Sequence, residues 1–286
     1  MKRQDFRFSQ RLRVRWAEVD MHQIVFNAHY LTYVDAAMTG YWRAVALPYV
    51  DAMRHLGGDI FMRKTGIEFK SSAQLDDILD VRLKCARIGV SSMVFEAGIF
   101  RDDELLVQPE MIYVFADPVA RASKPVPQAL RDTLMAFEAG EPMVTVTTGN
   151  WATLGDAAGS LRTEVFVNEQ RIPAEMEWDD ADADAVHAVA TNRLGQAIAC
   201  GRLLKAGPGV AKIGRMAVRR MLRGSGIGRQ VLDRLLDEAR LRGDREVVLH
   251  AQRSAEAFYR GLGFAPRGLE FEEAGIPHIE MVRGLR

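Results

Sequence analysis

The chain has 286 residues, of which 48% are hydrophobic, with 38 basic and 38 acidic side chains. This length exceeds that of a typical single domain, and each half of about 140 residues is long enough to bury its own core. Bases and acids balance in both halves, with 18 of each up to residue 140, which argues against nucleic-acid binding.

The start of the chain lacks the apolar core of a signal peptide, and no apolar run is long enough to span a membrane. The two cysteines, Cys85 and Cys200, fall in different halves, each inside an apolar strand-like segment. We expect both to be buried, reduced thiols of a cytoplasmic protein. The histidines are scattered without metal-ligand spacing, so neither a metal nor a tightly bound cofactor is expected.

The first half has the pattern of one long helix followed by an antiparallel sheet. Apolar residues at positions 30, 31, 33, 34, 37, 38, 41, 42 and 45 form a stripe so wide that it predicts a helix buried nearly all round. Strand-like segments follow at 59–70, 78–88, 91–101 and 105–116, with turn residues between them. This order predicts an α+β domain whose sheet wraps the helix.

The segment before that helix, WAEVDMHQIVFNAHY, resembles the loop motif of the hotdog thioesterases of the 4-hydroxybenzoyl-CoA thioesterase and YbgC type. That motif has an acid, an Asp two residues later, a Gly-x-Val element and a Tyr that opens the long helix. The residues in register are Glu18, Asp20, Val25, Asn27 and Tyr30. KPVPQALRDTL (124–134) is similar to the family's Pro-rich C-terminal segment, so the resemblance covers about residues 7 to 138.

The resemblance implies an acyl-CoA thioesterase in which Asp20 is the catalytic carboxylate, attacking the thioester carbonyl or activating a water. Backbone amides around Asn27 would hold the oxyanion, with the helix dipole behind them, and Glu18 would support the loop. The resemblance also implies a homodimer or homotetramer. Without it, Asp20 is interpreted as an ordinary loop or capping aspartate.

Two residues depart from the thioesterase pattern. Gln23 stands where the family usually has a glycine, and Asn27 replaces a histidine that some YbgC-type enzymes carry near the helix start. His22 and His29 lie close by in the sequence as possible substitutes for that histidine, or as polar surface residues. These departures bear on the substrate and on what assists Asp20, because the carboxylate itself is retained.

RGSGIG (223–228) is the most informative segment of the second half. It lies between an apolar strand, 213–218, and an amphipathic helix with apolar residues at Ile227, Val231, Leu235 and Ala239. Its three glycines let the backbone turn tightly and keep side chains away from a ligand, and amides that converge at a helix N-terminus can bind an anion. The spacing matches neither a P-loop nor a dinucleotide-binding turn, and a tight turn that binds nothing is the alternative.

This turn resembles the Arg/Gln-x-x-Gly-x-Gly/Ala turn of the GNAT N-acyltransferases, with Arg223, Gly226 and Gly228 in register. In that family the turn holds the pyrophosphate of acetyl-CoA, which would here be a substrate. The resemblance assigns acyl-CoA binding to the turn and to the end of the strand before it. The residues so assigned are Met216, Ala217, Val218, Arg223, Gly224, Ser225, Gly226, Ile227 and Gly228.

Further segments extend this resemblance to about residues 145 to 283. AEAFYRGLGF (255–264) is similar to the second GNAT motif, in which the residue matched by Tyr259 protonates the departing CoA thiolate. The alternative is that Tyr259 is a core aromatic residue. The segments 161–182 and 271–281 resemble the ElaA subgroup of GNAT proteins, a resemblance that does not identify the acceptor.

The second half also separates its charges along the chain. Residues 164–184 hold eight acids against one base, Arg171, and residues 202–229 hold eight bases and no acid. A basic block around a phosphate-binding turn suits a ligand with several phosphates. The acidic block would suit a cationic amine acceptor, unless both runs are simply solvated faces.

The sequence therefore predicts a hotdog thioesterase domain at 1–140 and a GNAT acyltransferase domain, an α/β fold with a mixed sheet and flanking helices, at 141–286. The predicted function is thioester hydrolysis in the first half and acyl transfer, by the resemblance acetyl transfer, from CoA to an amine in the second. Two alternatives stay open. In the first, one half is catalytically silent and serves as a module for CoA sensing or oligomerisation. In the second, the hydrolysed thioester is carried by an acyl-carrier or peptidyl-carrier protein.

Overall fold

The computed structural model describes residues 1–285, which form two compact units that divide between Met143 and Val144. Across the described residues, no helix is both long and apolar enough to cross a membrane.

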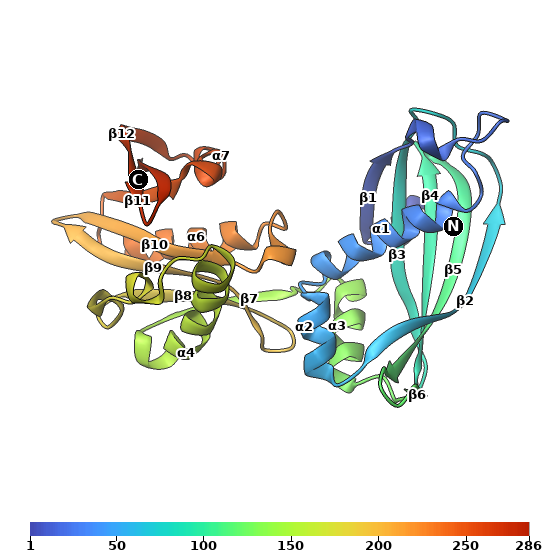
Figure 1. Ribbon diagram of the computed structural model, residues 1–286, viewed down its shortest axis with the longest axis horizontal. Coiled ribbons are helices and arrows are strands. Elements are labelled where there is room, and N and C mark those ends of the chain that lie inside the picture. Colours follow the sequence, from blue (N-terminus) through green and yellow to red (C-terminus); the bar gives the residue numbers. More distant parts are fainter. Residues whose placement is uncertain (286) are drawn as a thin grey trace. The chain divides into compact units, whose positions relative to one another are not determined.

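The first unit is built on an antiparallel sheet whose principal strands follow the order β1-β3-β4-β5-β2 (Figure 1). Four of its strands confirm the predicted segments to within a residue or two, and β1 was not predicted. A short strand, β6, pairs with β5. The strands are β1 (Phe8–Arg13), β2 (Asp59–Phe69), β3 (Ile78–Ile88), β4 (Ser92–Arg101), β5 (Glu104–Asp117) and β6 (Ala122–Ser123).

The long helix α1 (His29–Ala44) lies against the concave side of this sheet (Figure 1), which confirms the predicted plan of a sheet wrapped around a helix. Its buried face carries large aromatic side chains, and the ring of Tyr41 lies 5.5 Å from that of Phe95 on β4. The helix is not buried nearly all round, as the stripe suggested. One side is exposed at Thr32, Asp35, Ala36, Thr39 and Arg43, because the sheet covers only the opposite side.

Two shorter helices complete the first unit. Each ends at a glycine in the left-handed region, Gly57 (φ 71°) and Gly140 (φ 87°), which is a common way for a helix to stop. The helices are α2 (Tyr49–Leu56) and α3 (Gln128–Ala139), with single 3-10 turns at Arg3–Asp5 and Trp16–Glu18.

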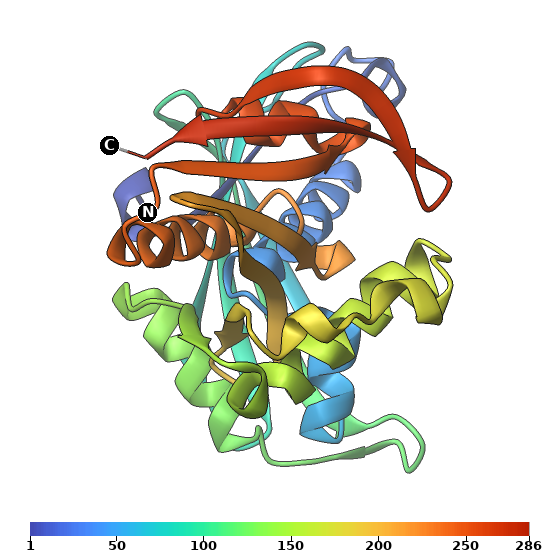
Figure 2. The ribbon, with the colours of Figure 1, turned by 90° about the vertical axis from the view of Figure 1, so that its left-hand side faces the viewer.

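The second unit has a seven-stranded sheet in the order β12-β13-β11-β10-β9-β8-β7 (Figure 2). Its neighbours are antiparallel except for β10 and β11, which run parallel, so the sheet is mixed as predicted. The strands are β7 (Val144–Gly149), β8 (Val186–Asn192), β9 (Ala197–Gly207), β10 (Val210–Val218), β11 (Glu246–Gln252), β12 (Ala265–Glu273) and β13 (Ile276–Gly284).

Helices α4 and α6 pack against strands of this sheet. Helix α6 buries the predicted stripe, including Val231 and Leu235. Helix α4 continues into a stretch of π-helix, η3, and together they bury Leu161, Val165 and Phe166. The helical elements are α4 (Trp151–Arg162), η3 (Thr163–Glu169), α5 (Ala174–Glu177), α6 (Ile227–Leu241) and α7 (Glu256–Arg260), with 3-10 turns at Asp180–Asp182, Arg220–Leu222 and Arg253–Ala255.

Candidate functional site

Asp20 lies in a tight loop just before α1. Val19 and Val25 pair as an antiparallel bridge, and the amide of Asp20 donates to the carbonyl of Ile24 at 2.9 Å. One carboxylate oxygen, Oδ1, accepts the amide of His22 at 2.8 Å. Within residues 1–285, Oδ2 accepts no hydrogen bond. The loop therefore fixes the carboxyl group through one oxygen and leaves the other available to a reactant.

The other limb of this loop carries amides without partners. The amide of Phe26 donates to the carbonyl of Glu18 at 2.9 Å, which ties the start of α1 to the segment before Asp20. The next two amides, of Asn27 and Ala28, donate to no acceptor in the part of the chain that the structure describes. They stand at the N-terminal end of a 16-residue helix, where a developing negative charge is stabilised.

Glu18 supports the loop from inside. Its side chain is 2% exposed and accepts hydrogen bonds from the Tyr33 hydroxyl at 2.8 Å and from the amide and Nε of Arg15, each at 2.7 Å. Burial alone would raise the pKa of Glu18, but the hydrogen bonds from Arg15 and Tyr33 hold it below the usual value. An ionised carboxylate so fully engaged holds the loop in place rather than reacting.

Gln23 has a backbone conformation that explains why a glycine is common at this position. Its φ is +61°, in the left-handed region that costs an L-residue about 1–2 kcal/mol. Its amide donates to the carbonyl of Asp20 at 2.9 Å, so the turn forms in spite of that cost. The departure from the thioesterase pattern at this position therefore adds strain to the loop without preventing the turn.

Apolar side chains gather on the neighbouring edge of the sheet. Strand β2 is an edge strand that pairs with β5 alone, and Phe61, Met62 and Phe69 on it are each about half exposed. The ring of Phe69 lies 5.7 Å from that of Tyr30, in the first turn of α1. An exposed apolar edge beside a loop with a free carboxylate oxygen is the kind of surface that a second chain covers.

In the second unit, the glycine-rich turn joins β10 to α6 as predicted. Gly224 (φ 81°) and Gly226 (φ 84°) have left-handed backbones, and an added Cβ at either would meet no atom within 4 Å. Gly228 differs, because it lies in the first turn of α6, where a Cβ would come within 3.2 Å of the Val218 side chain. Two of the three glycines thus shape the turn, and the third lets α6 approach β10.

Four amides of this turn are free to bind an anion, because they donate to no group within residues 1–285. Those of Gly224, Gly226, Ile227 and Gly228 donate to no acceptor among the described residues. The Ser225 hydroxyl donates to the carbonyl of Leu222 at 2.5 Å, so it braces the turn. A phosphate placed there would meet several unpaired N–H groups at a helix N-terminus.

The side chain of Arg223 braces the same turn. Its Nη1 and Nη2 donate to both carboxylate oxygens of Glu169, at 2.6 and 2.8 Å, and its Nε donates to the carbonyl of Val218 at 3.0 Å. The hydrogen bonds from the Arg223 guanidinium group to Glu169 are the main reason that the pKa of Glu169 is lowered. The amide of Arg223 donates to the carbonyl of Arg220 at 3.3 Å, so both its backbone N–H and its guanidinium group brace the turn and leave phosphate binding to the amides that follow.

A cavity of about 430 Å³ opens where β10 and β11 separate. The two strands are paired in register as far as Ile213 and Leu249. Beyond them the cavity is lined by Gly214, Arg215 and Met216 on β10 and by His250 and Gln252 on β11. A register shift between Gly214 and Ala217, where Arg215 has φ 52°, bends β10 at this point. Of the three strand-end residues assigned to acyl-CoA, Met216 lines the cavity, whereas Ala217 is buried and Val218 faces the glycine turn.

Tyr259 lies on the short helix α7 and lines the same cavity. It is 8% exposed, and burial raises its pKa to about 12. A thiol has a pKa of about 8.5, so a phenol at this value donates a hydrogen bond to a thiolate without giving up its proton at equilibrium. The arrangement suits stabilisation of a departing sulfur more than full protonation of it.

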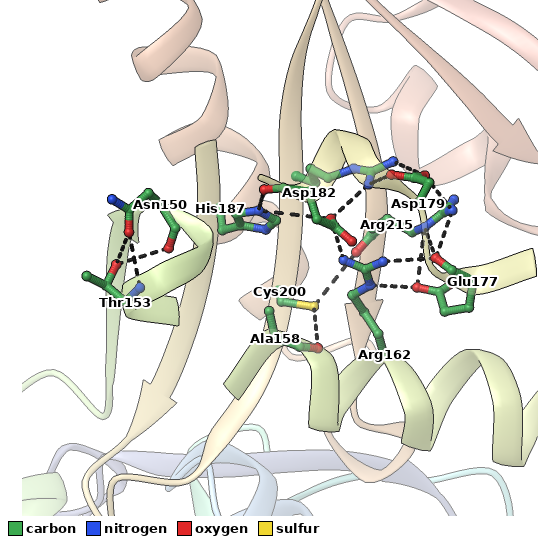
Figure 3. Close-up of polar contacts among 11 residues, drawn as sticks. Asn150, Thr153, Ala158, Arg162, Glu177, Asp179, Asp182, His187, Cys200 and Arg215 are labelled. Carbon is green, nitrogen blue, oxygen red and sulfur yellow. Dashed lines mark hydrogen bonds and ion pairs between the residues drawn. The ribbon is translucent and has the colours of Figure 1, made fainter. Parts of the chain in front are cut away.

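A network of three arginines and three acids forms part of the cavity wall, and Arg162, Arg202, Glu177 and Asp182 in it are buried (Figure 3). Arg162 is 1% exposed and donates to Glu177 at 2.5 Å and to Asp182 at 2.7 Å. Its guanidinium carbon lies 4.8 Å from the centre of the Trp178 ring. Burial alone would raise the pKa of Asp182, but hydrogen bonds from Arg162 and Arg202 lower it. A network so enclosed is held by mutual pairing, because each ion alone would be costly to bury.

This network corrects the interpretation of the two charge blocks. Most of the acids expected to attract a cationic acceptor are instead paired with arginines. Arg202 pairs with Asp179 and Asp182, Arg215 with Glu177 and Asp179, Arg219 with Glu164, and Arg223 with Glu169. The blocks neutralise each other inside the unit. Lys212, a cation of the basic block, lines the cavity and forms no ion pair with another described residue.

Sequence reasoning did not identify the polar groups on the far wall of the cavity. His250 on β11 lies 3.1 Å from Glu273 on β12, and His278 on β13 lines the same space. The two histidines are 28 positions apart, so only the sheet order brings them together. Among residues 1–285, no group of three or more His, Cys, Asp or Glu side chains could hold a metal ion.

Comparison with known proteins places a different family on each unit. Residues 155–285 match the family described as acetyltransferase (GNAT) domain, and residues 22–108 match the thioesterase superfamily. The second match begins two residues after Asp20, so it does not reach that residue.

The chain is similar to protein ElaA of Escherichia coli, 35% identical over 127 residues, or 43% of this chain and 82% of that protein. Among solved structures it is similar to an acyl-CoA N-acyltransferase from Pseudomonas aeruginosa (38% identity, 49% of this chain, 99% of that chain, TM-score 0.45). A 1,4-dihydroxy-2-naphthoyl-CoA thioesterase from Synechocystis is similar at 18% identity, covering 45% of this chain and 95% of its own, with a TM-score of 0.42.

Proposed function

The chain belongs to the GNAT N-acyltransferase family through its ElaA-like C-terminal half, its residues 22–108 match the thioesterase superfamily, and we propose that both halves act on acyl-CoA. Residues 1–140 hydrolyse an acyl-CoA thioester. Residues 141–286 transfer an acyl group, acetyl in the first instance, from CoA to an amine. The observation that carries the proposal is that each half has, where its chemistry needs them, polar groups that lack hydrogen-bond partners among the described residues. In the first half these are Oδ2 of Asp20 and the amides at the start of α1, and in the second half they are four amides of the glycine-rich turn.

In the thioesterase half, Asp20 is the reactive carboxylate. Its free Oδ2 attacks the thioester carbonyl or takes a proton from a water that attacks it, and the C–S bond then breaks to release CoA. The amides of Asn27 and Ala28 hold the oxyanion, supported by their lack of other partners. Glu18 keeps the loop in position through Arg15 and Tyr33.

We further propose that a second copy of the chain covers the β2 edge. The half-exposed Phe61, Met62 and Phe69 support this, because they lie on an edge strand, and Phe69 packs against Tyr30 in the first turn of the helix that follows the Asp20 loop. The chain would then act as a homodimer or homotetramer, with each Asp20 site completed by its neighbour.

In the transferase half, the turn from Arg223 to Gly228 binds the pyrophosphate of acyl-CoA through its unpaired amides. The thioester reaches the cavity between β10 and β11 alongside Met216, where Tyr259 donates a hydrogen bond to the sulfur as it departs. No tightly bound cofactor is needed, since acyl-CoA is the substrate. Cys85 and Cys200 are buried and unpaired, which supports a reducing, cytoplasmic setting.

The test is to incubate the full chain with acetyl-CoA and longer acyl-CoAs, with and without primary amines. Free thiol released without amine reports hydrolysis, and the amide product, measured by mass spectrometry, reports transfer. Thiol release without any amide product would contradict the proposed transferase activity. Amide formation without hydrolysis would contradict the proposed thioesterase activity. Faster hydrolysis of acyl-carrier-protein thioesters than of CoA thioesters would replace the proposed substrate.

A further inference from the structure

The cavity of the second unit contains a histidine oriented by a carboxylate. His250 is the first residue of β11 beyond its pairing with β10, and its Nδ1 lies 3.1 Å from Oε2 of Glu273. Glu273 ends β12, directly before the turn into β13, in the hairpin seen in red in Figure 2. The His250 side chain is 30% exposed, so its ring is partly open to the cavity.

The partner determines which ring nitrogen of His250 can act. An ionised carboxylate only accepts hydrogen bonds, so Nδ1 of the neutral imidazole carries the proton and Nε2 is left with a free lone pair. Burial alone would raise the pKa of Glu273, but its hydrogen bond with His250 helps to lower it, which favours the ionised carboxylate. The ring of Phe271 packs edge-on against His250 with centroids 4.9 Å apart and limits its rotation.

We propose that His250, held by Glu273, accepts the proton of the amine that the cavity binds, and that this acceptor is a primary amine on an apolar body. The inference rests on the acyl-transfer function proposed above. It assigns His250 as a catalytic residue and Glu273 as the residue that positions it.

The step balances without any further reagent. The bound ammonium ion gives one proton to Nε2 of His250, and the lone pair so freed attacks the thioester carbonyl to form the C–N bond. The tetrahedral intermediate then expels CoA as the C–S bond breaks, with Tyr259 donating a hydrogen bond to the sulfur. The second nitrogen proton ends on the thiolate, which gives the amide and CoA–SH, and His250 returns its proton to solvent.

The charged groups around His250 come from three neighbouring strands. Glu273 on β12 and Glu280 on β13 are the acids, and Lys212 on β10 is a base that acts electrostatically on both. His278 lines the cavity as well, but its Nδ1 lies 2.7 Å from the carbonyl of Ile276. Glu280 is already paired with Arg267 at 2.5 Å, so Glu273 is the carboxylate that would face an ammonium ion beside His250.

The rest of the cavity wall favours an apolar body for the acceptor. Arg202 and Arg215 line it, but both are paired with Asp179, so they offer little charge to a ligand. The remaining wall includes large apolar side chains, among them Phe166, Ile172, Met176, Leu204 and Leu249. A polyamine would find one ammonium site here and no second one.

The experiment uses the full chain, acetyl-CoA and 2-phenylethylamine, with the amide product measured directly so that hydrolysis does not interfere. We expect His250→Gln to lower kcat about 100-fold or more near pH 7, with CoA affinity unchanged by calorimetry. The deficit should shrink as the pH rises toward the pKa of the amine, because free amine then needs no base. Glu273→Gln should show a smaller loss with the same pH trend, and Glu272→Gln, its exposed neighbour, should match the parent.

Each other outcome contradicts a defined part of the proposal. A parent-like rate and pH profile in His250→Gln would remove His250 as the base while leaving acyl transfer in place. Faster turnover of spermidine than of 2-phenylethylamine would overturn the apolar acceptor. If the parent acetylates no amine although it binds CoA, the acyl-transfer function itself fails. Should His250→Gln lose CoA binding through misfolding, the pH profile of Glu273→Gln decides, since a purely structural glutamate would not change it.

Discussion

Ile213 and Leu249 are the last residues that β10 and β11 hold in parallel register, and the cavity of the second unit opens directly beyond them. Strands that part at this point leave room between them for a ligand. The shift in β10 between Gly214 and Ala217 turns its last residues toward the glycine turn. A single separation of two strands therefore brings the proposed phosphate site, Tyr259 and His250 to one region.

The first prediction concerns the hydrolytic carboxylate. Asp20→Asn should lower thioester hydrolysis about 100-fold or more, because the amide keeps the size of the side chain but can neither attack nor accept the proton. Acyl transfer should be unchanged. Asp132→Asn, on the exposed side of α3, is the matched control and should hydrolyse at the parent rate. Near-parent hydrolysis in Asp20→Asn would require Glu18 or a histidine as the reactive group.

A second prediction separates phosphate binding from backbone strain. Gly226→Val should weaken CoA binding to the full chain at least tenfold, about 1.4 kcal/mol, because the side chain would stand among the unpaired amides. Gly195→Val is the control, since Gly195 has a similar φ of 74° and open surroundings in the turn between β8 and β9. Calorimetry should show lower stability in both variants but lost CoA affinity in Gly226→Val alone. Equal CoA binding by the two would reduce RGSGIG to a simple turn.

The third prediction addresses the buried ion network. Arg162→Met should destabilise the second unit by about 3–5 kcal/mol, because it leaves Glu177 and Asp182 buried without their partner. Arg229→Met removes an exposed pair with Asp233 and should cost no more than about 0.5 kcal/mol. Denaturant unfolding followed by tryptophan fluorescence measures both, since Trp151 and Trp178 flank Arg162. A cost for Arg162→Met as small as that of the control would mean that the network relaxes or admits water.

The sequence patterns predicted the individual helices and strands but did not predict the residues that meet in the cavity. Alternation and turn residues located β3, and the apolar stripe located α6, because both patterns are local. The arginine of the network was missed because Arg162 looks like a polar residue at the end of an amphipathic helix, although it follows Leu161 within the buried stripe. His250 and Glu273 are joined only by the order of the strands, and no local pattern contains that order.

The fourth prediction is that the full chain sediments as a dimer or a larger oligomer through its first unit. Phe69→Lys should shift it toward the monomer, because a charge on the β2 edge opposes pairing with a second edge. Val50→Lys is the control, since Val50 is 64% exposed on α2 and is not part of the β2 edge. Sedimentation velocity across a range of concentrations measures both. A parent chain that stays monomeric would contradict the proposed completion of the Asp20 site by a second copy.

The last prediction tests the strain at Gln23. Gln23→Gly should raise the stability of the first unit by up to about 1 kcal/mol, because glycine adopts the φ of +61° without steric cost but loses more entropy on folding. Gln128→Gly, in the first turn of α3, should instead lower stability by up to about 1 kcal/mol. Thioester hydrolysis should persist in Gln23→Gly, since the path of the Asp20 loop is unchanged. A loss of stability equal to that of Gln128→Gly would show that side-chain contacts of Gln23 outweigh its backbone strain.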